Sequence, residues 1–222
     1  MRRDLAAADP DPEPELLSDD VHGGPAPIVL QVPTQGDAAG GTGDVELVDG
    51  ATVRVRAIRP DDDDALLAFH AKLSHESIVL RFFGPHPRLS EAEVRRFTQV
   101  DGVDRVALVA VQASEIVAVA RYDRPPGSDE AEVAFVVVDA WQHRGLGTIL
   151  LQDLAETARS HGVRWLVADT LSENFRMLNV FRDAGFPRTF TRASEVMHVV
   201  MDIGSPPPGP RSSSDIAPSS DV

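Results

Sequence analysis

A run of β-branched residues leads into a turn with two glycines and then into a long amphipathic pattern, and this segment constrains the fold more than any other. The run ends at Val138, the glycines are Gly145 and Gly147, and the amphipathic pattern covers 146–161. Such an order presents free backbone N–H groups at a helix N-terminus, where the helix dipole favours negative charge. Glycine also lets a ligand approach closely, because it has no Cβ. The segment predicts an anion site suited to a pyrophosphate, although the same glycines would also serve packing in an ordinary strand-to-helix turn.

Two common phosphate motifs do not fit this turn. The dinucleotide-binding fingerprint needs a third glycine three residues after Gly147, where the chain has Leu150. The phosphate loop of NTPases needs a lysine directly after its last glycine, and the only lysine in the chain is Lys72. The predicted pyrophosphate site therefore belongs to neither class.

The rest of the central region alternates strand and helix patterns. We expect strands at 52–58, 106–111, 116–120, 131–138, 164–170, 189–191 and 196–201, and helices after Pro60, at 74–83, from Ser90, at 146–161 and at 173–184. Ser90 and Glu93 have the spacing of a capping box. The four aspartates at 61–64 are interpreted as the acidic first turn of a helix rather than as a metal site. This order predicts an α/β protein in which helices flank a mixed sheet.

Charge is distributed unevenly along the chain, and its distribution predicts the domain limits. The formal net charge is −14, with 11 acidic residues against two arginines in residues 1–50. Of the 17 prolines, 11 lie near the two ends. Segments of this composition cannot bury enough apolar surface to offset the entropy of ordering them. We therefore expect disordered tails at 1–48 and 204–222 around one domain at 49–203, with the apolar run at 28–32 as a candidate edge strand.

Composition excludes several classes of protein. The chain has no cysteine, which removes disulfides, Cys-zinc sites, iron–sulfur clusters and a cysteine nucleophile. An acidic chain is a poor general nucleic-acid binder, because phosphate contacts need clustered Lys and Arg. No apolar run reaches the roughly 18–20 residues of a membrane helix, and the N-terminus lacks the apolar core of a signal peptide. His70, His75 and His86 lack the spacing of metal ligands. We expect a cytoplasmic protein with no metal site and no nucleic-acid or membrane partner.

The turn also carries a family signature. Residues 142–147, Gln-His-Arg-Gly-Leu-Gly, match the pattern Gln/Arg-x-x-Gly-x-Gly/Ala, and the downstream segment reads Glu173-Asn174-x-x-Met177 … Phe181 … Gly185-Phe186. Together with the order of elements over about 51–203, these motifs make the sequence resemble the GNAT acetyltransferases. The resemblance implies the GNAT fold, which is a mixed and mostly antiparallel central sheet flanked by helices, and it implies acetyl-CoA as co-substrate.

The resemblance further implies which residues bind acetyl-CoA. In the family, the turn and helix hold the pyrophosphate, and the backbone of the preceding strand holds the pantetheine arm. The implied set is Val136, Val137, Val138, Gln142, His143, Arg144, Gly145, Leu146, Gly147, Thr148 and Asn174. Asn174 has a second interpretation as a residue that starts a helix. Solvent exposure is the alternative for His143 and Arg144.

Three more segments narrow the resemblance to bacterial protein lysine acetyltransferases of the Pat type. They are Ser74-x-Glu76-Ser77-x-x-x-Arg81-Phe82-Phe83, residues 103–109 and residues 130–135. Enzymes of this type acetylate an active-site lysine of acyl-CoA synthetases, so the resemblance implies such a lysine as the acceptor. Many of them carry a further regulatory domain, for which we expect no room here. Residues 81–83 are expected either to shape the acceptor groove or to pack in the core, and core packing is the favoured expectation for both aromatics, Phe82 and Phe83.

Acetyl transfer to an amine needs a neutral nitrogen, and this requirement points to a general base. A free lysine has a pKa of about 10.4, so its deprotonation at pH 7 costs roughly 4–5 kcal/mol. A positioned carboxylate can take the proton directly or through water. Glu132 is the candidate, because a charge on an otherwise apolar strand face needs a role or a partner, and the resemblance implies a glutamate base in this strand. A salt bridge to an arginine is the alternative, and Glu130 is the second candidate base.

The usual general acid of the family is missing. A tyrosine often protonates the leaving CoA thiolate in the family, but the matching position here is Phe181. The only tyrosine, Tyr122, is expected to pack in the sheet. We expect direct transfer, because no cysteine can carry the acetyl group, with water or no acid at the thiolate. The alternatives are a small-amine acetyltransferase, marked by an acidic and enclosed acceptor pocket, and a non-catalytic acyl-CoA-binding module.

Overall fold

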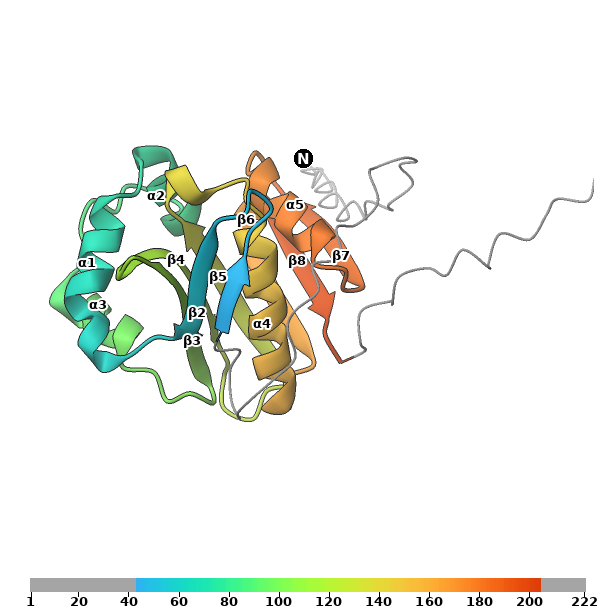
Figure 1. Cartoon of the computed structure of the whole chain (residues 1–222). Helices are drawn as coiled ribbons and strands as arrows, with labels where there is room; N and C mark the ends of the chain where they lie inside the picture. The colour runs from blue at the N-terminus through green and yellow to red at the C-terminus, as the bar shows by residue number, and fades with distance from the viewer. Residues whose placement is uncertain (1–42, 205–222) are drawn as a thin grey trace, which may run out of the picture.

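The computed structural model describes residues 43–204, which form an eight-stranded sheet with helices on both faces (Figure 1). The strands are β1 (Gly43–Glu46), β2 (Thr52–Ala57), β3 (Arg105–Gln112), β4 (Glu115–Asp123), β5 (Glu130–Val137), β6 (Trp165–Leu171), β7 (Arg188–Ala193) and β8 (Val196–Asp202). Their order across the sheet is β1-β2-β3-β4-β5-β6-β8-β7. In this sheet β5 and β6 are parallel, and the other neighbouring strands are antiparallel. The predicted mixed and mostly antiparallel sheet is confirmed.

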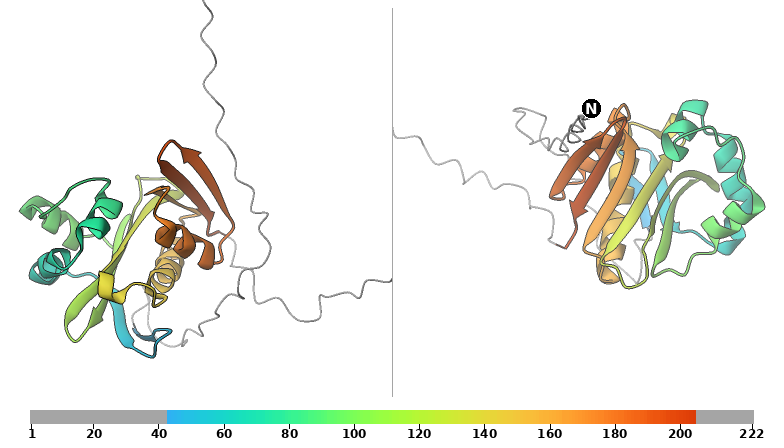
Figure 2. Two further views of the ribbon diagram at one scale, coloured as in Figure 1. Left: turned by 90° about the horizontal axis from the view of Figure 1, so that it is seen from above. Right: turned by 180° about the vertical axis from the view of Figure 1, so that it is seen from behind.

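Helices cover both faces of this sheet (Figure 2). They are η1 (Pro60–Asp62), α1 (Asp63–Ala71), α2 (His75–Phe82), α3 (Glu91–Thr98), η2 (Asp139–Trp141), α4 (Leu146–Ser160) and α5 (Phe175–Asp183). α1, α2 and α3 lie on one face, and α4 and α5 lie on the other. Each face has its own apolar core, one built with α4 and α5 and the other with α1 and α3. Within the described residues, no helix is long and apolar enough to cross a membrane.

Two helices on the α1–α3 face begin at serines that satisfy free N–H groups of the first turn. Ser74 Oγ accepts a hydrogen bond from the Ser77 N–H at 3.1 Å. Ser90 Oγ accepts from the Glu93 N–H at 3.3 Å, while the Glu93 carboxylate accepts from the Ser90 N–H at 2.8 Å. The predicted capping box is therefore confirmed, and the two helices share the side-chain cap made by the N-terminal serine.

The aspartates at 61–64 lie at the start of α1, and one of them is also paired. Asp62 is buried, and its carboxylate accepts hydrogen bonds from the Arg56 guanidinium and the Arg59 N–H, all at 2.7 Å. Burial acts to raise the pKa of Asp62, but these hydrogen bonds outweigh it and the pKa lies below its ordinary value. Within 43–204, no group of three His, Cys, Asp or Glu residues could hold a metal ion.

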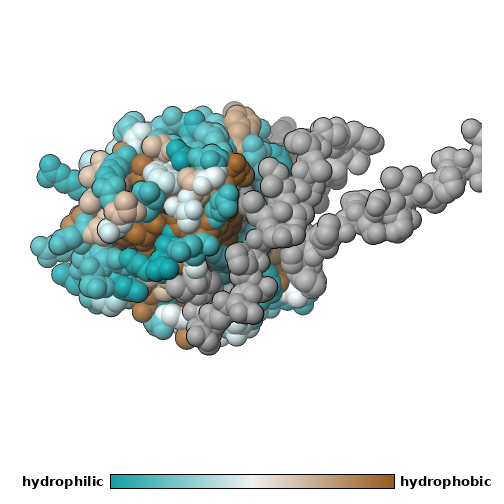
Figure 3. All heavy atoms as spheres, viewed as in Figure 1, coloured by the Kyte–Doolittle hydropathy of each residue, from teal (hydrophilic) through white to brown (hydrophobic). Residues whose placement is uncertain are grey.

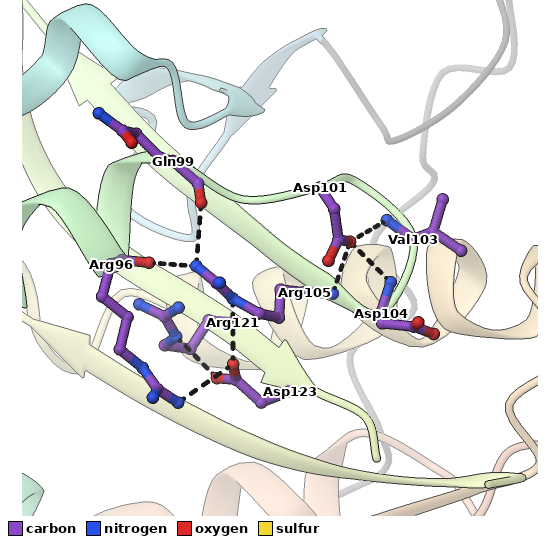
Figure 4. A network of polar contacts seen from close by, with 8 residues as sticks. All are labelled: Arg96, Gln99, Asp101, Val103, Asp104, Arg105, Arg121 and Asp123. Carbon is purple, nitrogen blue, oxygen red and sulfur yellow. Dashed lines mark hydrogen bonds and ion pairs between the residues drawn. The ribbon is translucent and has the colours of Figure 1, made fainter. Parts of the chain in front are cut away.

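A polar network joins α3 to the ends of β3 and β4 (Figure 4). Arg105 Nη2 donates to the backbone carbonyls of Arg96 and Gln99, at 2.6 and 2.9 Å. The buried Arg121 donates through Nε to Asp123 at 3.2 Å. A buried guanidinium needs such a partner, because an unpaired charge in the interior is strongly unfavourable. The network therefore holds α3 against β3 and β4, of which β4 pairs with β5.

The folded region begins earlier than the sequence predicts. β1 lies inside the tail expected at 1–48, and it pairs with β2 from Gly43 opposite Val55 to Glu46 opposite Thr52. Composition does not reveal this strand, because backbone pairing and an exposed ion pair hold it at the sheet edge rather than an apolar pattern. The expected domain start at 49 is therefore wrong. The run at 28–32 and the rest of both expected tails lie outside the described residues.

Candidate active site

The sheet splits between its two parallel strands, and the split opens into a cavity. β5 and β6 pair only over Glu130–Glu132 and Trp165–Val167. Beyond these residues the cavity has a volume of about 500 Å³ and is lined by β5, β6, α2, α5 and the start of α4. An ion pair of 3.2 Å between Arg176 of α5 and Glu76 of α2 links two of these helices. In the space-filling view, apolar surface shows between hydrophilic side chains (Figure 3).

The edge of β5 directs backbone groups into this split. The Asp129 carbonyl accepts a hydrogen bond from the Trp165 N–H at the start of β6, at 3.0 Å. Backbone groups of successive residues in a strand point to opposite sides, so every second residue from Asp129 faces β6. Past the paired region, Val133 and Phe135 are such residues, and both line the cavity. The Val133 N–H belongs to the last β5–β6 bridge, so the C=O group of Val133 and the N–H and C=O groups of Phe135 suit an extended ligand with amide groups of its own.

The three valines predicted to hold the pantetheine arm differ in their position relative to the cavity. Val137 faces the cavity, and its carbonyl already accepts from Gln142 Nε2 at 3.0 Å. Val136 also lines the cavity. Val138 is not part of the lining, because it is buried and both its N–H and its carbonyl are hydrogen-bonded inside the protein. Val138 therefore lies outside the cavity lining, whereas Val133, Ala134 and Phe135 of the same strand line the cavity and were not in the predicted set.

The turn before α4 has the features of an anion site. Gly145 is the N-cap of α4 with φ 81°, and His143 has φ 61°. In the part of the chain that the structure describes, no side chain caps this helix, and its first turn has no acidic residue. Leu146, Gly147 and Thr148 line the cavity, and their N–H groups have no partner within the helix. Free donors at a helix N-terminus fit a phosphate group.

Glycine is needed at the two positions of the turn for different structural reasons. At Gly145 the backbone adopts a positive φ that residues with a side chain rarely adopt. At Gly147 an added Cβ would lie 3.0 Å from Val180 Cγ2 of α5, which is tighter than ordinary van der Waals contact. Gly147 therefore allows α4 and α5 to pack, as the packing interpretation expects, whereas Gly145 shapes the turn itself.

Two side chains of the signature turn contact other protein groups, and of these two residues only Gln142 also lines the cavity. Gln142 Nε2 donates to Ser77 Oγ at 3.2 Å, in addition to its bond to the strand carbonyl. Arg144 forms an ion pair with Asp49 at 2.8 Å, and its guanidinium lies over the Trp141 ring, 4.6 Å from the centroid. The side chain of Gln142 therefore links the turn to α2 and to the end of β5, and Arg144 links it to the loop between β1 and β2.

Asn174 lies beside the cavity and begins α5. It is buried, and its Oδ1 accepts a hydrogen bond from the Met177 N–H at 3.1 Å. The helix-start interpretation is therefore what the structure shows. The cap occupies the carboxamide oxygen, so a ligand contact from this residue would come from its amide nitrogen.

Glu132 lies where the pairing of β5 with β6 ends, and it lines the cavity. It forms no ion pair with any residue of the described range, so the salt-bridge alternative is not observed. Arg81 of α2 lines the same cavity. Burial, reinforced by the charge of Arg121, lowers the pKa of Arg81 to about 10, although Glu132 opposes this shift. Glu130 is exposed and lies outside the cavity lining, so the second candidate base is not at the site.

A second carboxylate on the cavity wall escaped the sequence analysis. Asp169 of β6 lines the cavity, and its Oδ1 contacts His198 Nδ1 of β8 at 2.7 Å. Because Glu132 pairs with Val167, and Asp169 follows Val167 by two residues, the two carboxylates share one face of the sheet. The sequence could have pointed to Asp169, because this residue is an acid in the middle of the apolar segment Trp-Leu-Val-Ala-Asp-Thr-Leu.

The residues considered as general acids are placed as expected. Phe181 lines the cavity and is 1% exposed, and its ring meets the Phe135 ring edge-on with centroids 6.4 Å apart. Tyr122 is fully buried in the sheet, and its hydroxyl donates to the Val103 carbonyl at 2.7 Å and contacts His161 Nδ1 at 2.8 Å. Burial raises the pKa of Tyr122 to about 12. Tyr122 is also not part of the cavity lining, so it has no access to a leaving thiolate.

The segment 81–83 is divided between the cavity and the packing of α2, and core packing is wrong for Phe83, which is 48% exposed. Arg81 and Phe83 line the cavity. Phe82 instead stacks on His86, with ring centroids 4.3 Å apart. The first and last residues therefore face the site, and the middle one packs on its own side of the sheet.

Comparisons with known proteins agree with this geometry. Residues 74–186 match the Acetyltransferase (GNAT) family. The solved GNAT domain of S. lividans PAT is 43% identical to the chain, with a TM-score of 0.69, and the match covers 72% of this chain and 96% of that domain. Acetyltransferase PA5475 of Pseudomonas aeruginosa is 27% identical over 144 residues, which are 63% of this chain and 77% of that protein. Acetyltransferase Pat of Mycolicibacterium smegmatis is 28% identical over 144 residues, which are 64% of this chain but 43% of that protein.

The matched region contains the elements that build the cavity. It begins at Ser74, which caps α2, and ends at Phe186, just after α5. Between them lie the split strands and the turn whose free N–H groups fit a pyrophosphate. This chain therefore belongs to the GNAT family and is an acetyltransferase that uses acetyl-CoA as its co-substrate.

Proposed function

We propose that this acetyltransferase is a protein lysine N-acetyltransferase that modifies an acyl-CoA synthetase, with Glu132 as general base. The observation that carries the proposal is the carboxylate of Glu132, which has no ion-pair partner in the described structure and lies where the open edge of β5 meets the α2 side of the cavity. Similarity to two Pat proteins supports the choice of acceptor. The proposal implies a cytoplasmic location.

The proposed reaction transfers the acetyl group directly. Glu132 takes a proton from the lysine ammonium, directly or through one water molecule, and the nitrogen lone pair then forms a bond to the acetyl carbonyl carbon. The bond from that carbon to the CoA sulfur breaks, and the sulfur leaves as a thiolate. The nitrogen releases its second proton to solvent, and solvent protonates the thiolate. Solvent is assigned this step because Phe181, at the family tyrosine position, has no acidic proton.

Two exposed aromatic residues beside the cavity favour a protein acceptor. Phe83, at the end of α2, is 48% exposed, and Phe175, the first residue of α5, is 67% exposed. Phe83 lines the cavity, and both neighbours of Phe175 do so as well. Exposed aromatic side chains are typical of protein–protein contacts. The proposal therefore has the acceptor lysine enter between α2 and α5.

Labelled acetyl-CoA and purified acetyl-CoA synthetase test the function. We expect the full chain to transfer label to one or a few lysines of the synthetase, which peptide mass spectrometry can map. A synthetase with its active-site lysine changed to arginine is the control and should lose the main labelled site. Turnover of a small amine without label on any protein would contradict the proposal.

A small-molecule amine acetyltransferase is the second candidate, because one observation suits it. Three carboxylates, against two arginines, line one cavity, and this acidic excess favours a cationic amine; the acids are Glu132, Asp169 and Asp183. This candidate predicts saturable turnover of a diffusible amine. The two candidates share the base and the co-substrate and differ only in the acceptor.

Replacing Asp169 tests the acceptor side under either candidate. We expect Asp169→Asn to raise the KM for the amine acceptor about tenfold, because one charge contact to the ammonium is lost. The KM for acetyl-CoA should stay within about twofold of the wild type, since the pyrophosphate turn is untouched. His198→Gln leaves the carboxylate in place and should have the smaller effect. Equal acceptor KM values for Asp169→Asn and the wild type would remove Asp169 from the acceptor site.

A further inference from the structure

The turn that fits the pyrophosphate is hydrogen-bonded to the first turn of α2, a segment 65 residues away in the sequence. The Asp139 carboxylate in η2 accepts three hydrogen bonds from this segment. They come from the Ser74 N–H at 3.1 Å, the Ser74 hydroxyl at 2.7 Å and the Ser77 hydroxyl at 3.1 Å. One side chain just before the signature turn therefore holds the start of the helix on the acceptor side.

Gln142 completes the connection from the side of the turn. Its Nε2 donates to Ser77 Oγ at 3.2 Å and to the Val137 carbonyl at 3.0 Å, and its backbone N–H donates to the Asp139 carbonyl at 3.2 Å. Ser77 is 6% exposed, so its bonds to Gln142 and Asp139 are partly buried, whereas the bonds from Ser74 to Asp139 are exposed. We refer to Ser74, Ser77, Asp139 and Gln142 together as the α2–turn bracket.

Charge strengthens the bracket. Burial acts to raise the pKa of Asp139, but the hydrogen bonds from Ser74 and Ser77 outweigh it, and the pKa lies below its ordinary value. The carboxylate is therefore ionised at neutral pH, and hydrogen bonds to an ionised acceptor are about twice as strong as neutral ones. The carboxylate also meets the N-terminus of α2, where the helix dipole favours a negative charge.

The location of the bracket gives it a role beyond stability. On one side, Gln142 is followed by the turn whose N–H groups at 146–148 face the cavity. On the other side, Ser77 is one helical turn before Arg81, which also lines the cavity. Four hydrogen bonds join the two elements, three between side chains and one from the Ser74 N–H. If one element shifts, either these bonds break or the other element moves with it.

We propose that the α2–turn bracket is a set of positioning residues that fixes the pyrophosphate turn for coenzyme A and couples that turn to α2 on the acceptor side. The expected effect on the affinity for coenzyme A follows from the use of acetyl-CoA by the family. The coupling to an acceptor lysine rests on the proposed function. Because binding linkage is reciprocal, coenzyme A that holds the turn also holds α2 in place for the acceptor.

The two serine caps allow a matched test. Ser74 and Ser90 each cap an eight-residue helix through the same bond, but Ser74 also bonds Asp139. We expect Ser74→Ala and Ser90→Ala to lower the Tm by similar small amounts. Only Ser74→Ala should weaken binding of coenzyme A, by about fivefold to tenfold in calorimetry. Ser74→Thr keeps a capping hydroxyl and should restore the affinity to within about twofold.

Other outcomes of this experiment would overturn the proposal. An equal change of the coenzyme A Kd in Ser74→Ala and Ser90→Ala would assign the bracket to stability alone. If Ser74→Ala folds poorly, Asp139→Asn provides the second variant, because it keeps an acceptor and removes the charge; a Kd within twofold of the wild type would then reject the proposal. Coenzyme A alone is the probe, so these results do not depend on whether the acceptor is a protein lysine.

Discussion

Glu132→Gln is expected to lower kcat for acetyl transfer at pH 7 by about 10²- to 10⁴-fold, the usual contribution of a general base. Glutamine keeps the size of the side chain and cannot take a proton. The variant must therefore rely on the small fraction of acceptor lysine that is already neutral. Its rate should rise about tenfold for each pH unit below the lysine pKa of about 10.4, more steeply than the wild type near neutral pH.

The affinity for acetyl-CoA separates a chemical role of Glu132 from a structural one. Glu132 lies on β5, away from the N–H groups at 146–148, so calorimetry should give a Kd within about twofold of the wild type. Glu130→Gln is the matched control, because it removes the same charge from the same strand outside the cavity lining. If Glu132→Gln retains activity within a few-fold, or if Glu130→Gln loses as much, the base assignment is wrong.

Gly145→Val is expected to weaken coenzyme A binding by about 100-fold, with little residual activity at ordinary acetyl-CoA concentrations. A β-branched residue at φ 81° is strained by about 1–3 kcal/mol. The turn relieves this strain by moving, and the N–H groups at 146–148 move with it. Isothermal calorimetry with coenzyme A measures the loss.

Gly162 provides the control for this prediction. It follows the other end of α4 with φ 80°, and nothing lies within 4 Å of an added Cβ there. Gly162→Val therefore introduces the same backbone strain far from the turn, and it should lower the Tm without changing the coenzyme A Kd. Similar Kd values for Gly145→Val and the wild type would remove the turn from the phosphate site.

Most elements of the fold could be predicted, because their signals are local. The capping box at Ser90, the hairpin of β3 and β4 and the amphipathic pattern of α4 each depend on residues a few positions apart. β1 was missed because it has little apolar pattern of its own and is held by pairing with β2. Such a segment becomes a strand because it pairs with a neighbouring strand, and its own residues do not reveal that pairing.

The site was predicted in outline and corrected in its contacts. Glu132 and the turn at 142–148 meet in one cavity, as the family signature implies. Val138 is excluded because both of its backbone groups are used internally, and this depends on strand alternation rather than on residue type. Asp169 joins the cavity because β6 lies beside β5, and Gln142 links the turn to α2 through its bond to Ser77.

The sequence by itself determined the strand, the two-glycine turn and the helix, because backbone conformation, capping and apolar periodicity are encoded over a few neighbouring residues. The tertiary structure decided where the sheet splits and which side chains meet there. The ion pair between Glu76 and Arg176 spans 100 positions, and the bonds from Asp139 to α2 span about 65. Such contacts depend on strand register and helix packing, which arise from the whole chain, so residue patterns identified the chemistry and only the fold assembled its parts.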